Sequence, residues 1–174
     1  MPEIVKVAIV GSGPAGASAA AHAAKLGMAH VLLERTDHAS DTIYKYQKGK
    51  FVMATPDILP LRSDLQFQAG KREEILGAWD QGLEDHQVNI RFNADVEAIS
   101  NKDGVFTLSI RGGDPVLAEN VVLSIGLQGN INKLRCKGAD LPFVQYQLDD
   151  PDEYEAETIV VIGAGDAAIE NAVA

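Results

Sequence analysis

The chain has 174 residues, of which 46% are hydrophobic and 23% charged, a balance typical of a soluble globular protein with one substantial core. Its formal net charge of −10 argues against an extended surface for nucleic acid or an anionic membrane, because phosphate groups would be repelled over most of the molecule. The single cysteine, Cys136, excludes an internal disulfide, a CxxC pair and a cysteine-rich metal site within this chain. No secretory or membrane-spanning segment is visible, so we expect a cytoplasmic protein that holds no metal.

The first forty residues have the pattern of a dinucleotide-binding unit. Residues 6–10 form an apolar run that is typical of a parallel strand covered on both faces. The glycine-rich turn that follows consists of Gly11, Ser12, Gly13, Pro14, Ala15 and Gly16. An alanine-rich helix comes next and ends at Gly27, and residues 31–33 predict a second strand that ends at Glu34.

Each glycine of this turn has a physical reason. The first permits the tight turn, the second lets a pyrophosphate approach the backbone, and the third lets helix and strand pack closely. Glu34 follows the first glycine by about 20 residues, the spacing of a carboxylate that accepts hydrogen bonds from ribose hydroxyls. Its charge would repel a 2′-phosphate, so the site suits FAD or NAD rather than NADP. Arg35, the next residue, is a further candidate for this site.

The middle of the chain changes from irregular sequence to short strands. Residues 35–70 show no clear periodicity, and loops of this length are usually functional or disordered. Within them, Tyr44, Tyr46 and Lys48 are candidates for approaching a flavin or a substrate, but no catalytic residue is identified. A helix is predicted over 71–86, with Trp79 in the core.

Five short strands are predicted after that helix. They span 88–92, 96–100, 105–110, 116–119 and 121–125. The second to fourth are joined by hairpin turn signals and predict an antiparallel meander inserted into the parallel unit. Val96 begins this meander, and Gly126 closes the last strand.

A second glycine-rich motif lies near the C-terminus. Residues 159–162 predict a strand, and Gly163, Gly165 and Ala168 then take the three small-residue positions at the start of a helix. We therefore predict an α/β protein with a Rossmann-like domain over 1–127, a connector over 128–158, and the start of a second, truncated Rossmann-like domain over 159–174. The four histidines show no metal-ligand spacing, and we expect them at the surface or at helix ends.

The order of these parts resembles the two-dinucleotide-domain flavoproteins of the pyridine nucleotide-disulfide oxidoreductase superfamily. The nearest likeness is to their thioredoxin-reductase-like and flavin-monooxygenase-like branches. The resemblance implies that the first motif and Glu34 bind the ADP half of FAD, that Val96 lies near the adenine, and that Gly126 passes beside the same cofactor. It also implies that the second motif binds NAD(P)H.

The resulting expectation is an FAD-dependent NAD(P)H oxidoreductase that works without a CxxC dithiol. Its electron acceptor, a small molecule or a protein, is not identified, and homodimer formation stays open. We expect the isolated 174-residue chain to be inactive. Two alternatives remain: a non-catalytic nucleotide-sensing module, and an NAD-dependent dehydrogenase that uses the first motif for NAD.

Overall fold

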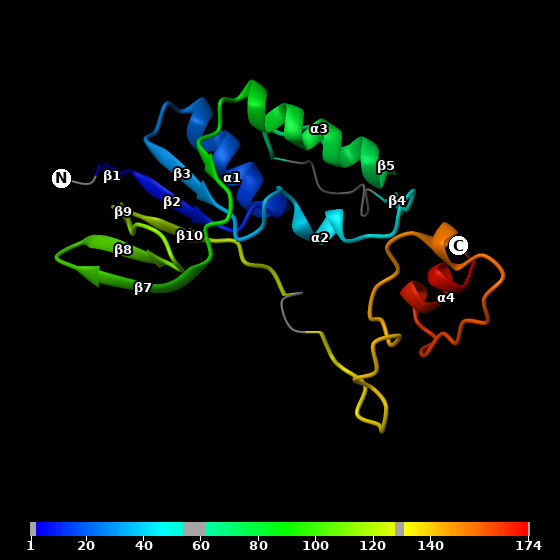
Figure 1. Ribbon diagram of the computed structural model, residues 1–174. Helices are drawn as coiled ribbons and strands as arrows, with labels where there is room; N and C mark the ends of the chain where they lie inside the picture. Colours follow the sequence, from blue (N-terminus) through cyan, green and yellow to red (C-terminus); the bar gives the residue numbers. More distant parts are fainter. Residues whose placement is uncertain (1–2, 54–61, 128–130, 174) are drawn as a thin grey trace.

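The computed structural model describes residues 3–53, 62–127 and 131–173 (Figure 1). A parallel sheet lies at its centre, and Ala8 of one inner strand pairs with Val31 on one side and Val121 on the other. The strands in spatial order are β10 (Val121–Leu123), β2 (Val7–Val10), β3 (His30–Leu33) and β6 (Ile90–Arg91). All four residues of β3 are buried, which is why its sequence is a continuous run rather than an alternation.

One face of this sheet is covered by two helices, α1 (Pro14–Lys25) and α3 (Arg72–Asp85). Ile9 of β2 and Leu32 of β3 point toward this face, where small alanines of α1 let the helix approach closely. Trp79 of α3 is buried in the same cluster, as predicted. The opposite face presents Ala8 to a second cluster, because neighbouring strand residues alternate between the two faces.

The second cluster lies under a second four-stranded sheet. Its strands in spatial order are β1 (Ile4–Val5), β9 (Val116–Ala118), β8 (Val105–Ile110) and β7 (Val96–Lys102). Strands β7, β8 and β9 are antiparallel and confirm the predicted meander. The tight turn between β7 and β8 places Asp103 and Gly104 at φ values of 53° and 85°, the left-handed conformation that a two-residue hairpin needs. The predicted fold class is therefore confirmed.

Some predicted elements differ in detail from those observed. The irregular stretch contains the short helix α2 (Asp41–Tyr44) and a small hairpin of β4 (Phe51–Val52) with β5 (Gly70–Lys71). Residues 54–61 of that stretch lie outside the described part of the chain. His30 was expected at the surface or at a helix end, and this is wrong, because it lies on the strand β3 and is 8% exposed.

The C-terminal region contains a 3-10 turn (Pro151–Tyr154) and the helix α4 (Asp166–Val173), which begins at the predicted motif. The strand predicted over Ile159–Ile162 is not formed. These four side chains are 40% to 80% exposed, and within the described ranges no strand pairs with them. A strand needs a partner backbone for its hydrogen bonds, so the apolar run alone does not produce one.

Candidate dinucleotide site

The turn between β2 and α1 is shaped by two glycines that the protein itself requires. Gly11 has a φ of 95° and donates its N–H to the Leu33 carbonyl at 2.8 Å. A Cβ on Gly11 would lie 2.6 Å from the carbonyl oxygen of Ser124, and one on Gly16 would lie 1.8 Å from that of Gly11. No side chain fits at either position, so both glycines are explained by the packing of strand, turn and helix.

Gly13 has a different environment. Its φ of −63° suits any residue, and a Cβ added there would meet no protein atom within 4 Å. It precedes the first turn of α1, which no side chain caps and whose first residue, Pro14, has no N–H to donate. The open helix end carries a partial positive charge and free space beside the backbone, which fits the pyrophosphate of a dinucleotide.

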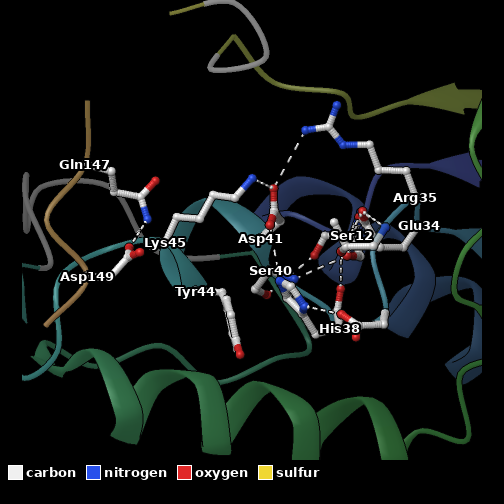
Figure 2. A network of polar contacts seen from close by, with 12 residues as sticks. Ser12, Glu34, Arg35, His38, Ser40, Asp41, Tyr44, Lys45, Gln147 and Asp149 are labelled. Carbon is white, nitrogen blue, oxygen red and sulfur yellow. Dashed lines mark hydrogen bonds and ion pairs between the residues drawn. The ribbon is translucent and has the colours of Figure 1, made fainter. Parts of the chain in front are cut away.

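Glu34 lies beside this helix end, at the carboxyl end of β3, and is 6% exposed. Its Oε2 accepts hydrogen bonds from the N–H of Ser12 at 2.9 Å and from the Ser12 hydroxyl at 2.6 Å (Figure 2). Its Oε1 accepts from the N–H of Thr36 at 3.0 Å. Burial raises the pKa of this carboxyl, but the donors of Ser12 and Thr36 outweigh burial and leave the pKa below its ordinary value. Glu34 is therefore ionised at neutral pH.

A second group of charged side chains surrounds Asp41, at the start of α2 (Figure 2). Its carboxylate pairs with Lys45 at 2.7 Å and with Arg35 at 3.8 Å. Burial raises the pKa of Asp41, but Lys45 and His38 lower it by more. The pKa of Asp41 therefore lies below its ordinary value. The imidazole of His38 stacks on the Tyr44 ring with centroids 3.7 Å apart. These contacts connect Arg35 with α2, which begins one residue after Ser40, the hydrogen-bond partner of Ser12.

The structure brings most residues of the first predicted site together. The N–H of Ser124 binds the Val10 carbonyl at 2.8 Å, so the end of β10 lies against the turn, and Gly126 follows with a φ of 64°. The N–H of Ala94 binds the Glu34 carbonyl at 2.7 Å, which places the chain entering β7 at Val96 beside this edge. By contrast, the second motif lies in the C-terminal region with α4, apart from the first (Figure 1).

Three residues that hold Glu34 or its neighbours by hydrogen bonds were not among the predicted site residues. Ser12 occupies a position of the motif that any residue can fill, and Thr36 and Ser40 lie in the stretch without periodicity. Ser40 has a φ of 59°, a conformation that carries no clear sequence signal in a serine. Of these three residues, only Ser12 lies within a pattern that the sequence shows, because it stands between Gly11 and Gly13 of the motif.

Two further features, a membrane-spanning helix and a metal site, concern the part of the chain that the structure describes. No helix there is both long and apolar enough to cross a membrane. Among the same residues, no group of three or more histidine, cysteine, aspartate or glutamate side chains is arranged to hold a metal ion. Cys136 is exposed and is a free thiol.

The sequence from residue 8 to residue 174 matches the pyridine nucleotide-disulphide oxidoreductase family. The chain belongs to this family. Its members are FAD-dependent NAD(P)H oxidoreductases, which confirms the predicted resemblance and the predicted cofactors at the level of the family.

Individual relatives agree with this assignment. A ferredoxin–NADP reductase of Ignicoccus hospitalis is 24% identical over 164 residues, covering 94% of this chain and 50% of the relative. A ferredoxin–NADP reductase of Bacillus thuringiensis is 26% identical over 174 residues, covering 97% of this chain and 47% of the relative. The chain thus spans about half the length of these curated relatives. Bacillithiol disulfide reductase Bdr (YpdA) from Staphylococcus aureus has the same fold, with a TM-score of 0.84 at 23% identity over 99% of this chain and 54% of that one.

Proposed function

We propose that this chain is the nucleotide-binding region of an FAD-dependent oxidoreductase that accepts a hydride from NAD(P)H and passes electrons to a further acceptor. The observation that carries the proposal is the open end of α1 at Gly13 beside the ionised carboxylate of Glu34. A helix end that attracts phosphate and a carboxylate that accepts ribose hydroxyls are the two recognition elements of an adenine dinucleotide.

The first site is assigned to FAD. Its turn is formed by Gly11, Gly13, Pro14, Ala15 and Gly16. Gly13 and the end of α1 face the pyrophosphate, and Glu34 binds the adenosine ribose, with Arg35 next to it. Val96 lies near the adenine, and Gly126 passes beside the same cofactor. Bound flavin would supply the redox chemistry, whereas these residues bind and orient it.

The second site is assigned to NAD(P)H. Gly163 and Gly165 lie just before α4, and Ala168 lies in its first turn. A Cβ on Gly163 would lie 3.5 Å from the Ala168 Cβ, an ordinary contact between small groups. This spacing favours the close packing that the motif requires. We propose the boundaries 1–127, 128–158 and 159–174 for the FAD-binding domain, the connector and the start of the NAD(P)-binding domain.

The acceptor is proposed only by class. Two relatives are named ferredoxin–NADP reductases and one structural neighbour a disulfide reductase. These names favour a protein or a small molecule as electron acceptor. We propose transfer without a CxxC dithiol for the residues of this chain, in which Cys136 is the only cysteine. We further propose a cytoplasmic location and leave homodimer formation to a sedimentation measurement.

An absorption spectrum tests the proposal directly. The purified chain is mixed with FAD, desalted and scanned for a retained flavin band. The proposal expects the band, and it expects Glu34→Ala to weaken FAD binding by about 1–3 kcal/mol, the scale for losing a charged hydrogen-bond partner. If no flavin is retained but NAD binds, the dehydrogenase alternative replaces the proposal.

A further inference from the structure

A buried hydroxyl connects the glycine-rich turn with the proposed ribose carboxylate. The side chain of Ser12 is completely buried, and its Oγ lies 2.6 Å from Oε2 of Glu34. On its other side, the backbone N–H of Ser40 is shared between this Oγ and the carbonyl oxygen of Ser12, at 3.2 Å from each. Ser40 is 1% exposed and its φ of 59° turns this N–H back toward the β2–α1 turn. Ser12 is thus held between two fixed neighbours.

These contacts determine the direction of the hydroxyl. A serine hydroxyl has one hydrogen to donate and two lone pairs that accept. Because the Ser40 N–H uses a lone pair of Oγ, and the Glu34 carboxylate can only accept, the hydroxyl hydrogen points at Oε2. Together with the Ser12 N–H at 2.9 Å, two donors from one residue fix Oε2.

The other carboxylate oxygen, Oε1, keeps acceptor capacity for a ligand. The Thr36 hydroxyl lies 2.8 Å from the His38 carbonyl and 3.1 Å from Oε1 of Glu34, and its single hydrogen favours the shorter contact. The Thr36 N–H is then the main donor to Oε1. Since each carboxylate oxygen offers about two lone pairs, Oε1 can still accept a ribose hydroxyl.

We propose that Ser12 is a positioning residue for dinucleotide recognition, whose hydroxyl holds the Glu34 carboxylate in the orientation that reads a ribose hydroxyl. This inference rests on the proposed function of the first site. It assigns part of the specificity to a position of the motif that has no direct contact with ligand in the proposed arrangement.

Competition between two nucleotides against bound FAD tests this role. ADP and 2′-deoxy-ADP differ only in the hydroxyl that Glu34 would read, and release of FAD is followed by flavin fluorescence. We expect the wild-type chain to bind ADP about tenfold tighter than 2′-deoxy-ADP, the usual effect of one charged hydrogen bond. In Ser12→Ala the ratio should fall to about two, because the carboxylate is no longer fixed.

Ser40→Ala is the matched control. It also removes a buried serine hydroxyl, but that hydroxyl lies 3.5 Å from the Ser12 carbonyl and does not contact Glu34, and the Ser40 N–H is retained. In Ser40→Ala, the ratio of ADP affinity to 2′-deoxy-ADP affinity should stay at the wild-type value. If Ser12→Ala does not fold, Ser12→Cys serves instead, since it keeps a polar atom at the γ position, with a sulfur somewhat larger than the oxygen, and is a weaker donor.

The outcomes separate this inference from the proposed function. Failure of the wild-type chain to bind FAD contradicts the proposed function. Retained FAD binding with an unchanged ratio in Ser12→Ala overturns only the role of Ser12. An equal loss of ratio in Ser40→Ala also overturns it, because general loosening of the cluster would then explain both results. In a Glu34→Ala background, Ser12→Ala should change the ratio no further.

Discussion

At the scale of single residues, Gly13 and Gly16 lie three positions apart in one turn but are required by different partners. Gly16 packs against the Gly11 carbonyl, whereas Gly13 faces open space. A methyl group at Gly13 would therefore contact no protein atom, and it would obstruct only a bound ligand. The distinction separates a motif that shapes the fold from one that binds a dinucleotide.

We predict opposite effects for alanine at these two positions. Gly13→Ala should change the unfolding free energy by less than about 1 kcal/mol, since no protein atom crowds the added methyl group and alanine is only a poorer N-cap than glycine, yet it should weaken FAD binding about tenfold. Gly16→Ala should destabilise the fold by about 1–3 kcal/mol through the clash with Gly11. Urea unfolding and FAD titration measure the two effects. Unchanged FAD affinity in Gly13→Ala would show that no pyrophosphate approaches this backbone.

The ionisation of Glu34 makes stability depend on pH. The pKa of this carboxyl is lower in the folded chain than the ordinary glutamate value of about 4.3. A lowered folded pKa contributes stability above the unfolded pKa, and this contribution is lost as the pH falls through the folded pKa. Between pH 6 and the acid transition, the unfolding free energy of Glu34→Gln should thus fall less steeply than that of the wild type. Parallel curves for the two proteins would contradict this prediction.

At the scale of elements, the sequence predicts the units with regular patterning and misses those that depend on a partner. The apolar runs of β2 and β3, the alanine helix α1 and the hairpin turn at Gly104 all form where the local pattern indicates. In these elements propensity, periodicity and turn chemistry agree.

The remaining elements depend on contacts that no local pattern reveals. The short helix α2 begins after Ser40, whose left-handed backbone bonds to Ser12 in a distant turn. The predicted strand at Ile159–Ile162 has the required composition but no partner among the described residues. The glycines and Glu34 of the site could be predicted from their spacing, whereas the Ser12–Ser40 contact required the tertiary structure.

His30 illustrates how strands of the central sheet are linked through a side chain. Its Nε2 accepts the N–H of Asn89 at 3.0 Å, so the hydrogen of the ring lies on Nδ1, 2.8 Å from the Met28 carbonyl. His30→Ala should cost about 1–3 kcal/mol, because the Asn89 N–H just before β6 loses its partner. Chemical unfolding measures this loss.

His86→Ala provides the comparison for that variant. This histidine is half-buried at the end of α3, and its ring makes no hydrogen bond within the described ranges. His86→Ala should therefore lower the free energy of unfolding much less than His30→Ala does. Similar losses in both variants would contradict the importance of the Asn89 contact.

At the scale of the whole molecule, the C-terminal region contacts the first domain through two lysines that flank Gly49. Lys50 pairs with Glu170 of α4 at 2.6 Å, and Lys48 pairs with Asp150 at 2.9 Å. The carboxylate of Asp150 raises the pKa of Lys48. The backbone N–H of Lys48 also donates to the Asp149 carbonyl at 2.8 Å. Because partly exposed ion pairs are weak and screened by salt, we expect high ionic strength to loosen this attachment.

We predict that Lys48→Ala with Lys50→Ala speeds proteolysis of residues 131–173 without lowering the melting temperature of the first domain. Removing these charges frees the C-terminal region, while the core clusters keep their contacts. High salt should speed cleavage of the wild type in the same way. Lys102→Ala, in the distant β7–β8 hairpin, is the control. Equal cleavage in all variants would show that the two lysines do not hold this region.

The chain also contains its own pair of optical labels. Trp79 is the only tryptophan and is fixed in the core by its indole N–H, which donates to the Gln66 carbonyl at 3.1 Å. Cys136, the only cysteine, is exposed in the C-terminal region. A dansyl group on this thiol would accept energy from Trp79, so one labelling step without mutagenesis yields a spectroscopic ruler between the two parts of the molecule.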